Sequence, residues 1–435
     1  MKSVTRELAF LVRDRGVLLS LATAAIAASV AILLGMMEVA QQRATIAELL
    51  EADRAERQVV QAGQTDWGGA AYYTFHLTVD EPTDFAFAAL GQREVSPWKH
   101  RIRMLALEGQ IYESDAGNPE FALTGRFDYA FVVSLLAPLL LILLVHDVRS
   151  SERTAGRQEW LSATSGNDHS PWRMRSGLKV ALLTGCLLVP LWIGGLASSS
   201  GVTVLALASL WTALHLLFWW GVCSLIDRRG WTSSVNLVAA SGAWLVLAVI
   251  APAAIQAIVD ASIHLPDGGD IVLTQREAVN DAWDLPKEAT MNPFVARHPE
   301  WEDHVEVTRP FEWKWYYAFQ QVGDQKAEEI SRAFRDGRQR RESLAAKLSW
   351  LSPPALLERA LQRAAQTDGR SALEYEDRVR RYHAQLRAWY YPKLFPDLPF
   401  DQDLLADIPE FSDEGPPDHH WQGGDQLIEE DSTTR

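Results

Sequence analysis

Residues 129–145 read YAFVVSLLAPLLLILLV, a run of 17 positions without a charged, amide or imidazole side chain. Four other apolar runs of similar length occur before residue 260, at 17–37, 178–197, 202–226 and 235–259. A helix needs about 20 apolar residues to cross the hydrocarbon layer of a bilayer, where its backbone must satisfy its own hydrogen bonds. The sequence therefore predicts an all-α polytopic membrane protein with five transmembrane helices.

The distribution of charge predicts which way these helices cross. Residues 1–16 have a net charge of +2, the 146–179 segment holds six basic and four acidic residues, and Arg228 and Arg229 join the last two runs. With five spans these three regions share one side, and basic residues in short loops mark the cytoplasmic side. We therefore expect a multi-pass protein of a cell inner (plasma) membrane, with a cytoplasmic N-terminus and an extracytoplasmic C-terminus.

Composition excludes several classes of protein. The net charge of -15 comes from the two acidic regions assigned to the outside, 38–128 and the chain after residue 259, and no basic stripe predicts a nucleic-acid partner. Cys186 and Cys223, the two cysteines, both fall in apolar runs, so we expect no stabilising disulfide outside the membrane. The first run is longer than the core of a secretory signal, and we expect it to remain as an anchor.

These boundaries divide the chain into five regions. They are the cytoplasmic N-terminus with the first span, the first extracytoplasmic segment, a four-span bundle with a cytoplasmic loop at 146–177, a helical extracytoplasmic region, and an acidic disordered tail: 1–37, 38–128, 129–259, 260–411 and 412–435. The tail after 412 has too few apolar residues to fold alone.

The two external regions differ in their expected secondary structure. A helix is predicted to continue over 44–61, and the alternating AYYTFHLTV of 71–79 predicts a short β element. Residues 261–315 show no sustained period and are expected to be irregular. Helices are predicted over 324–351, 353–365 and 373–391, and we expect 324–391 to pack with 67–128. The expected inward positions are Trp350, Leu351, Leu356, Leu357, Leu361, Tyr382, Leu386 and Trp389.

The loop HDVRSSERTAGRQEWLSATSG, residues 146–166, is the most informative local signal. One interpretation is a solvated basic loop that obeys the charge rule for cytoplasmic loops. The other is a short helix along the membrane that docks into another protein, with Trp160 and Leu161 as its apolar points. The loop's residues alone leave both interpretations open.

Longer stretches resemble a known family. Glu152-Arg153-Thr154-Ala155-Gly156 forms an E-R-x-x-G pattern that resembles the loop after the second span of ABC-2-type permeases. The blocks FAFAALGQREVSPWKHRIRMLALEGQ…LLAPLLLILL (85–144) and WLSPPALLERALQRAAQTDGRSALEYEDRVRRYHAQLRAWYYPKLF (350–395) resemble the permease family that carries the domain of unknown function 3526. The resemblance covers most of residues 1–411. Such permeases usually have six spans, but no apolar run follows Phe411, so the sixth helix is missing or a partner supplies that packing surface.

The resemblance implies a membrane-spanning permease subunit of an ATP-driven transporter. It implies that a separate ATP-binding subunit docks from the cytoplasm on 152–163, with Glu152, Arg153, Gly156 and Trp160 as the coupling residues, and that a second permease chain pairs with this one as a homo- or heterodimer. The alternative is a membrane-anchored scaffold that presents its external region to a partner and transports nothing.

No catalytic motif is found in the sequence. It has no G-x-x-x-x-G-K-[ST] loop for ATP, no H-E-x-x-H or zinc-type cysteine pair, and no G-x-S-x-G elbow. We therefore expect no enzyme activity, no cofactor and no resident metal. His419 and His420, in the acidic tail, are only a weak candidate for metal binding.

His215, in LWTALHLLFWWG, is the notable ionisable residue inside a predicted span. An ionisable side chain within a bilayer is costly to expose to lipid, so it is a candidate functional residue. The competing interpretation is a neutral imidazole that is hydrogen-bonded to a neighbouring helix.

The predicted topology can be tested directly. Because an odd number of spans places the two ends on opposite sides, reporter fusions at Gly166 and Gly423 should report opposite compartments, with the Gly166 fusion cytoplasmic. A cytoplasmic signal from the Gly423 fusion would mean that a span has been miscounted.

Overall fold

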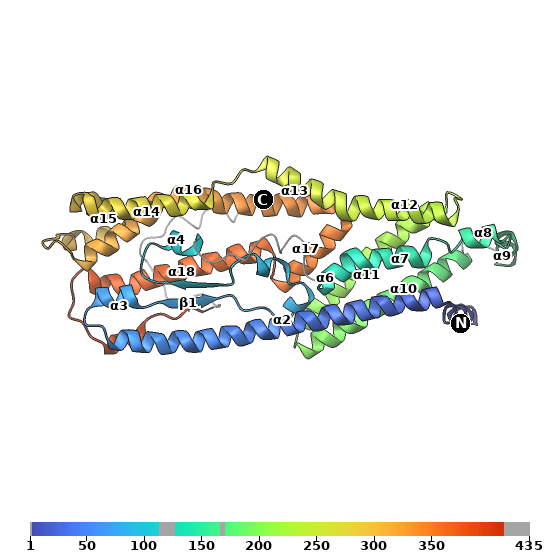
Figure 1. Cartoon of the computed structure of the whole chain (residues 1–435), viewed down its shortest axis with the longest axis horizontal. Coiled ribbons are helices and arrows are strands. Elements are labelled where there is room, and N and C mark those ends of the chain that lie inside the picture. Colours follow the sequence, from blue (N-terminus) through green and yellow to red (C-terminus); the bar gives the residue numbers. More distant parts are fainter. Residues whose placement is uncertain (1, 113–126, 166–169, 413–435) are drawn as a thin grey trace.

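The computed structural model describes residues 2–112, 127–165 and 170–412. It is elongated, with long apolar helices packed side by side at one end and the remaining helices at the other (Figure 1). Gly166, Gly423, His419 and His420, together with the tail after residue 412, lie outside the described residues.

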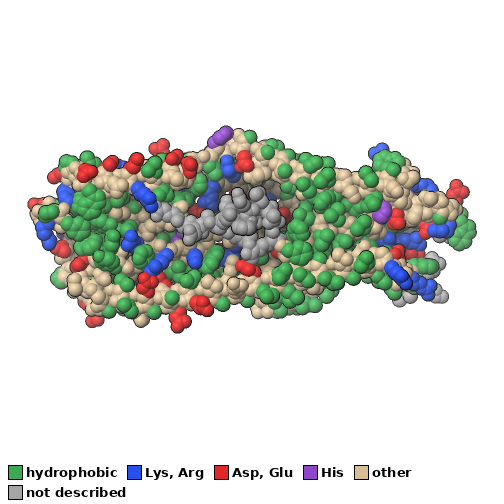
Figure 2. Space-filling model, in the orientation of Figure 1, with side chains coloured by type: hydrophobic (Ala, Val, Ile, Leu, Met, Phe, Trp, Pro, Cys, Tyr) green, Lys and Arg blue, Asp and Glu red, His purple; other side chains and the backbone are tan. Residues whose placement is uncertain are grey.

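Within the described residues, five helices are long and apolar enough to cross a membrane. They are Arg15–Ala62, Tyr129–Thr154, Trp172–Ala197, Val202–Asp227 and Ser233–Ser262. Each of the five predicted apolar runs lies within one of these helices, so the number and positions of the candidate spans are confirmed. Figure 2 shows hydrophobic side chains over this half of the molecule, while charged side chains gather at its far end and over the opposite half.

The candidate spans are built from α2 (Arg15–Ala62), α6 (Tyr129–Phe131), α7 (Ala137–Val145), α8 (Ser150–Thr154), α10 (Ser170–Ala197), α11 (Val202–Asp227), α12 (Ser233–Leu245) and α13 (Ala251–Ser262). Two of the spans contain a π-helical segment, Val132–Leu136 in the second and Val246–Ile250 in the fifth. A short helix, α1 (Lys2–Leu11), precedes α2, and α9 (Gln158–Ser165) follows α8.

The other half of the molecule, which we call the tail-side region, is mainly helical. Its elements are α3 (Trp67–Tyr73), β1 (His76–Val79), β2 (Lys99–Ile102), α4 (Leu107–Tyr112), α14 (Gly268–Asp284), α15 (Lys287–Arg297), α16 (Trp313–Leu348), α17 (Pro353–Ala365) and α18 (Gly369–Leu394). The strands β1 and β2 form an antiparallel pair in which His76 lies opposite Ile102 and Val79 opposite Lys99.

Several predicted elements shift once the chain folds. The helix expected over 44–61 is part of α2, which continues without a break to Ala62. The predicted strand over 71–79 forms only from His76, because the residues before it belong to the helix Trp67–Tyr73. Asp66 caps that helix: its carboxylate accepts a hydrogen bond from the Gly69 N–H. The expectation that 261–315 is irregular is wrong. That segment contains α14 and α15, whose largely polar outer faces hide the apolar period.

The predicted inward positions are mostly correct. Leu357, Leu361, Tyr382 and Leu386 are buried, and Leu356 and Trp389 are partly buried. The prediction is wrong for Trp350 and Leu351, which remain 70% and 62% exposed. Both residues lie at the turn between α16 and α17, which packs against the candidate spans.

A buried carboxylate joins three elements of the tail-side region. Asp324, on α16, accepts hydrogen bonds from the Leu107 and Glu108 N–H groups at the start of α4, at 2.7 and 3.2 Å. Gln275 Nε2 of α14 donates to the same carboxylate at 2.6 Å, and Arg387 of α18 forms an ion pair with it. Burial raises the pKa of Asp324, and the Arg387 guanidinium partly offsets that effect. Asp324 therefore fixes α4, α14 and α18 against α16.

Asp324→Asn should destabilise this region strongly. The substitution leaves the largely buried Arg387 charge without its anion, and breaking a fully buried ion pair costs about 3–5 kcal/mol, which is the upper bound here. Thermal unfolding of the purified chain, followed by circular dichroism, measures the loss. Asp336→Asn, an exposed position on the same helix, is the control and should leave the melting temperature unchanged. Equal melting temperatures for the two variants would contradict the structural role of Asp324.

The tail-side region also buries histidines that should make its stability depend on pH. His100, on β2, stacks on Tyr375 with ring centroids 5.5 Å apart, and neither ring nitrogen has a hydrogen-bond partner among the described residues. Burial, with a smaller contribution from Arg380, lowers the pKa of His100 to about 4. As the pH falls below the ordinary value near 6.5, the unfolded chain takes up the proton before the folded one does. The contribution of His100 to the free energy of unfolding is therefore complete above pH 6.5 and decreases as the pH falls toward 4.

His100→Phe should reduce this acid sensitivity. Each pKa unit of difference between the folded and unfolded chain corresponds to about 1.4 kcal/mol. The loss of stability between pH 7.5 and pH 5 should therefore be about 2 kcal/mol smaller in the variant than in the unsubstituted chain. Melting temperatures at the two pH values check this, with His264→Phe as an exposed control. An unchanged pH dependence in His100→Phe would refute the assignment.

Candidate functional site

The predicted coupling residues lie together at the end of the bundle farthest from the tail-side region. Glu152 and Arg153 are in α8, which ends in a Schellman motif at Gly156. The Gly156 N–H donates to Arg153 O, and the Arg157 N–H donates to Glu152 O, each at 3.0 Å. Gly156 has a φ of 70°, a left-handed conformation that glycine adopts at little cost. This glycine therefore sets the angle at which α9 leaves α8.

Glu152 is the centre of a cluster of ion pairs, the Glu152 cluster, which also includes Glu7, Arg157 and Arg175. Arg157 Nε donates to Glu152 Oε2 at 2.5 Å, and Arg175 Nη1 donates to Glu152 Oε1 at 3.1 Å. Arg175 Nε also donates to Glu7 Oε2 at 2.9 Å. Each partly exposed pair contributes little stability alone. The Glu152 carboxylate nevertheless joins α8 to α10 and to the start of α9, and Arg175 extends the contact to α1. The Glu152 cluster ties α1, α8 and α10 to the start of α9.

Two further contacts connect α8 with the last two spans. Arg153 donates to the carbonyl of Trp231, in the link between α11 and α12. Ser150 Oγ lies 2.8 Å from Ser233 Oγ at the start of α12. Helix α8 is therefore bonded directly to α10 and α12, and through Arg175 to α1.

Trp160 lies on α9, beyond this cluster, and is 68% exposed. The side chain of Leu161, the other predicted apolar point, lies outside the described residues. The structure thus brings Glu152, Arg153 and Gly156 into one joint and places Trp160 on the short helix that leaves it. The sequence pattern did not reveal Glu7 and Arg175 as partners of Glu152, because they belong to two other helices, α1 and α10.

His215 is separate from that joint and lies near the middle of the 26-residue helix α11. It is buried, and the Trp219 Nε1–H one turn later donates to its Nε2 at 3.2 Å. An Nε2 that accepts a hydrogen bond indicates a neutral ring whose proton is on Nδ1. The competing interpretation had predicted a hydrogen bond to a neighbouring helix. The hydrogen bond seen here is instead to Trp219 of the same helix. The backbones of Ser134 and Pro353 lie beside the imidazole.

Both π-helical segments contribute carbonyl groups to side chains of other elements. Leu135 O, in the second span, accepts from Trp244 Nε1 at 3.1 Å, and Leu247 O, in the fifth, accepts from Ser352 Oγ at 2.7 Å. A π-helical turn interrupts the regular α-helical pattern, and such turns are frequent at functional sites. His215 and these two turns place polar groups inside the bundle.

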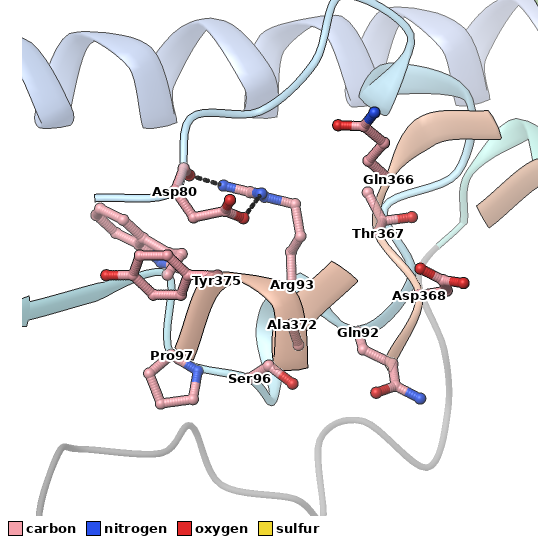
Figure 3. A pocket seen from close by; sticks show the side chains of 11 residues that line it. Asp80, Gln92, Arg93, Ser96, Pro97, Gln366, Thr367, Asp368, Ala372 and Tyr375 are labelled. Atoms are coloured by element: carbon pink, nitrogen blue, oxygen red, sulfur yellow. Dashed lines mark hydrogen bonds and ion pairs between the residues drawn. The ribbon is translucent and has the colours of Figure 1, made fainter. Parts of the chain in front are cut away.

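A pocket in the tail-side region does not offer a ligand site. It lies where the 80–98 segment meets the turn between α17 and α18, and Figure 3 shows Arg93 directed at Asp80. Arg93 and Arg378 occupy the two oxygens of the Asp80 carboxylate, at 2.7 and 2.5 Å. The Gln92 N–H also donates to Thr367 O at 2.8 Å. These polar groups satisfy one another, so the pocket is a packing junction.

Among the described residues, no group of three or more His, Cys, Asp and Glu side chains is placed to hold a metal ion. Residues 271–413 match the family model of DUF3526, a domain of unknown function. The matched segment begins in α14, includes α15 to α18 and contains none of the five candidate spans. No curated protein and no solved structure matches the chain.

Proposed function

We propose that this chain is a membrane-spanning subunit of an ABC-2-type transporter and that a separate subunit hydrolyses the ATP. The ATP-binding subunit would dock on α8 and α9 from the cytoplasm, and a second permease chain would complete the membrane part. The tail-side region would then be extracytoplasmic, in agreement with the charge bias of the loops.

The Glu152 cluster is the observation that carries this proposal. A transporter of this kind must convert movement of its ATP-binding subunits into movement of its spans. Here Glu152 joins α8, α1 and α10 through Arg175, while Arg153 and Ser150 connect the same short helix with the start of α12. A force on α9 would therefore act on several spans at once, because Gly156 and Arg157 hold α9 against α8.

The proposed mechanism requires no covalent chemistry in this chain. ATP binding would draw the two ATP-binding subunits together and move α9. The ion pairs would transmit that movement to the bundle, which would shift between inward-facing and outward-facing states. Transport then depends on the difference in substrate affinity between those states.

The size of the tail-side region favours one alternative function. Its aromatic core, which includes Trp315, Tyr317, Phe319 and Tyr390, is separate from the core of the bundle. A scaffold that presents such a domain to a partner would need the spans only as an anchor.

Trp160→Ala should weaken binding of the ATP-binding subunit while the chain still inserts into the membrane. Loss of a tryptophan anchor from an interface typically costs at least about 2 kcal/mol, or about 30-fold in Kd. Co-purification from membranes, with quantification of the bound ATPase, measures this effect.

Glu152→Gln should leave the ATPase bound but uncouple its hydrolysis from transport, because the neutral amide cannot form ion pairs with Arg157 and Arg175.

Glu159→Gln is the matched control for Glu152→Gln only, since Glu159 is exposed on α9 and forms no part of the Glu152 cluster, so hydrolysis should stay coupled to transport. If an ATPase co-purifies but cross-links from Trp160 never reach it, the docking site is wrong. If no P-loop ATPase co-purifies and a protein binds the tail-side region instead, the scaffold is the correct function.

A further inference from the structure

The end of the tail-side region farthest from the spans carries an exposed aromatic surface. Trp283, Leu285 and Phe311 are 52%, 47% and 41% exposed. The Trp283 and Phe311 rings are stacked with their centroids 6.4 Å apart, and Phe311 contacts the partly exposed Trp313 and Tyr316, with centroids 5.0 and 6.1 Å away. We call these five residues the tip patch. Large apolar side chains that gather at one surface mark a binding site, whereas single exposed ones do not.

The tip patch is too far from the spans to meet lipid. Helix α16 begins at Trp313, and its Arg341 donates to Ile263 O, directly after the fifth span. At 1.5 Å per residue, the stretch of α16 from Trp313 to Arg341 is about 40 Å long. Figure 1 shows α16 along the long axis of the molecule, with α15 at the end opposite the bundle. The bilayer therefore does not cover this surface.

Rings next to the tip patch already have cations of this chain over their faces, but Trp283 does not. Lys287 Nζ lies 2.8 Å from the centre of the Trp315 ring, and the Arg103 guanidinium lies 4.8 Å from the centre of the Tyr72 ring. Among the described residues, no Lys or Arg lies over Trp283. Tryptophan attracts a cation to its face more strongly than the other aromatic side chains do. Trp283 therefore offers a surface that a cation of another molecule can cover.

Acidic side chains beside the tip patch favour a cationic partner. Asp281 and Asp284 are exposed in the last turn of α14, and neither forms an ion pair within the described part of the chain. The helix dipole makes a last turn unfavourable for a carboxylate, so the stability of α14 does not explain these two residues. Lys314, a nearby basic residue, already pairs with Glu312 at 3.5 Å. Residues 281–316 hold eight acidic and four basic side chains, so the tip patch lies in an acidic part of the chain.

These charges disfavour a second copy of this chain as the partner. A two-fold contact places the same surface on both copies, so Asp281 and Asp284 would face their own counterparts, and like charges across an interface oppose association. A basic protein segment matches the surface instead. A guanidinium group stacks on aromatic rings and pairs with carboxylates, and apolar side chains of the same segment can cover Leu285 and Phe311.

We propose that the tip patch binds a basic segment of a partner protein on the tail side of the membrane. An arginine or lysine of that segment stacks on Trp283 and pairs with Asp281 and Asp284, while an apolar side chain packs on Leu285 and Phe311. The proposal holds whether or not the chain transports a substrate, because it involves neither α9 nor an ATP-binding subunit.

Binding of defined peptides to the full chain in phosphatidylcholine nanodiscs tests this partner. One set of fluorescent peptides combines arginine with leucine or tyrosine in different orders. A matched set has citrulline, the neutral analogue, at every arginine. Fluorescence anisotropy gives the Kd, and empty nanodiscs give the background, which uncharged lipid keeps low for basic peptides.

Trp283→Ala should weaken binding of the arginine peptides about 30-fold, the loss typical of a tryptophan anchor. The double variant Asp281→Asn and Asp284→Asn should also weaken binding and should reduce its dependence on salt, because it removes the charges that attract the peptide. All three positions are exposed, so the variants should keep the fold, and their melting temperatures check this.

Two matched controls use exposed residues outside the tip patch. They are Trp350→Ala, and the double variant Glu329→Gln and Asp336→Asn on α16, and both should leave the Kd unchanged. The citrulline peptides should bind at least about tenfold more weakly than the arginine peptides.

Three results with the peptides would each overturn the proposal: no arginine peptide binds above background, the citrulline peptides bind equally well, or the control variants lose as much affinity as the tip-patch variants. Binding of a neutral oligosaccharide, chitotetraose, would also overturn it if Trp283→Ala abolished that binding and the Asp281 and Asp284 substitutions left it unchanged. The tip patch would then be a glycan site.

Discussion

The uninterrupted helix α2 links the two halves of this molecule. Its apolar first half packs in the bundle, and its charged second half continues beside the tail-side region to Ala62 (Figure 1). Gly35 allows an unusually close contact there, since a Cβ at this position would lie 2.0 Å from the Phe87 carbonyl oxygen. Because a helix is rigid over this length, α2 gives both halves a common axis, and the loops that return from the tail-side region pack against it.

The two halves are stabilised by different kinds of interaction. The spans pack aliphatic and small residues, and single hydrogen bonds such as Trp244 to Leu135 O and Trp192 to Ser209 join neighbouring helices. The tail-side region combines aromatic rings with buried ion pairs. Arg380 contacts Glu108 at 2.9 Å and Asp324 pairs with Arg387, so that α4, α16 and α18 are joined by charge as well as by packing. Such pairs add little net stability compared with apolar packing, but they are strongly destabilising when one partner is lost.

The spans receive contacts from both of their ends. At one end the Glu152 cluster joins α8 to α1 and α10, and Ser150 connects it to α12. At the other end α17 lies against the second, fourth and fifth spans, where Ser352 occupies a carbonyl of a π-helical segment and Pro353 adjoins His215. A rearrangement of these spans would therefore change the contacts at both ends. This arrangement gives a physical route by which an event at α9 could reach the tail-side region.

The sequence alone was sufficient for the number and positions of the candidate spans, because lipid-length apolar runs leave the backbone no alternative to a helix. It also predicted the bounds of α17, because the Thr367-Asp368-Gly369 turn that follows this helix is a local signal. The choice of Glu152, Arg153 and Gly156 as coupling residues came from the resemblance and stays a prediction. The sequence could not predict α14 and α15, whose apolar stripes are narrow. Nor could it identify Glu7 and Arg175 as partners of Glu152, or predict that Trp350 and Leu351 would stay exposed. Those features depend on contacts between residues far apart in the chain, and only the packing of α16 and α17 against the spans decided which of their side chains would be covered.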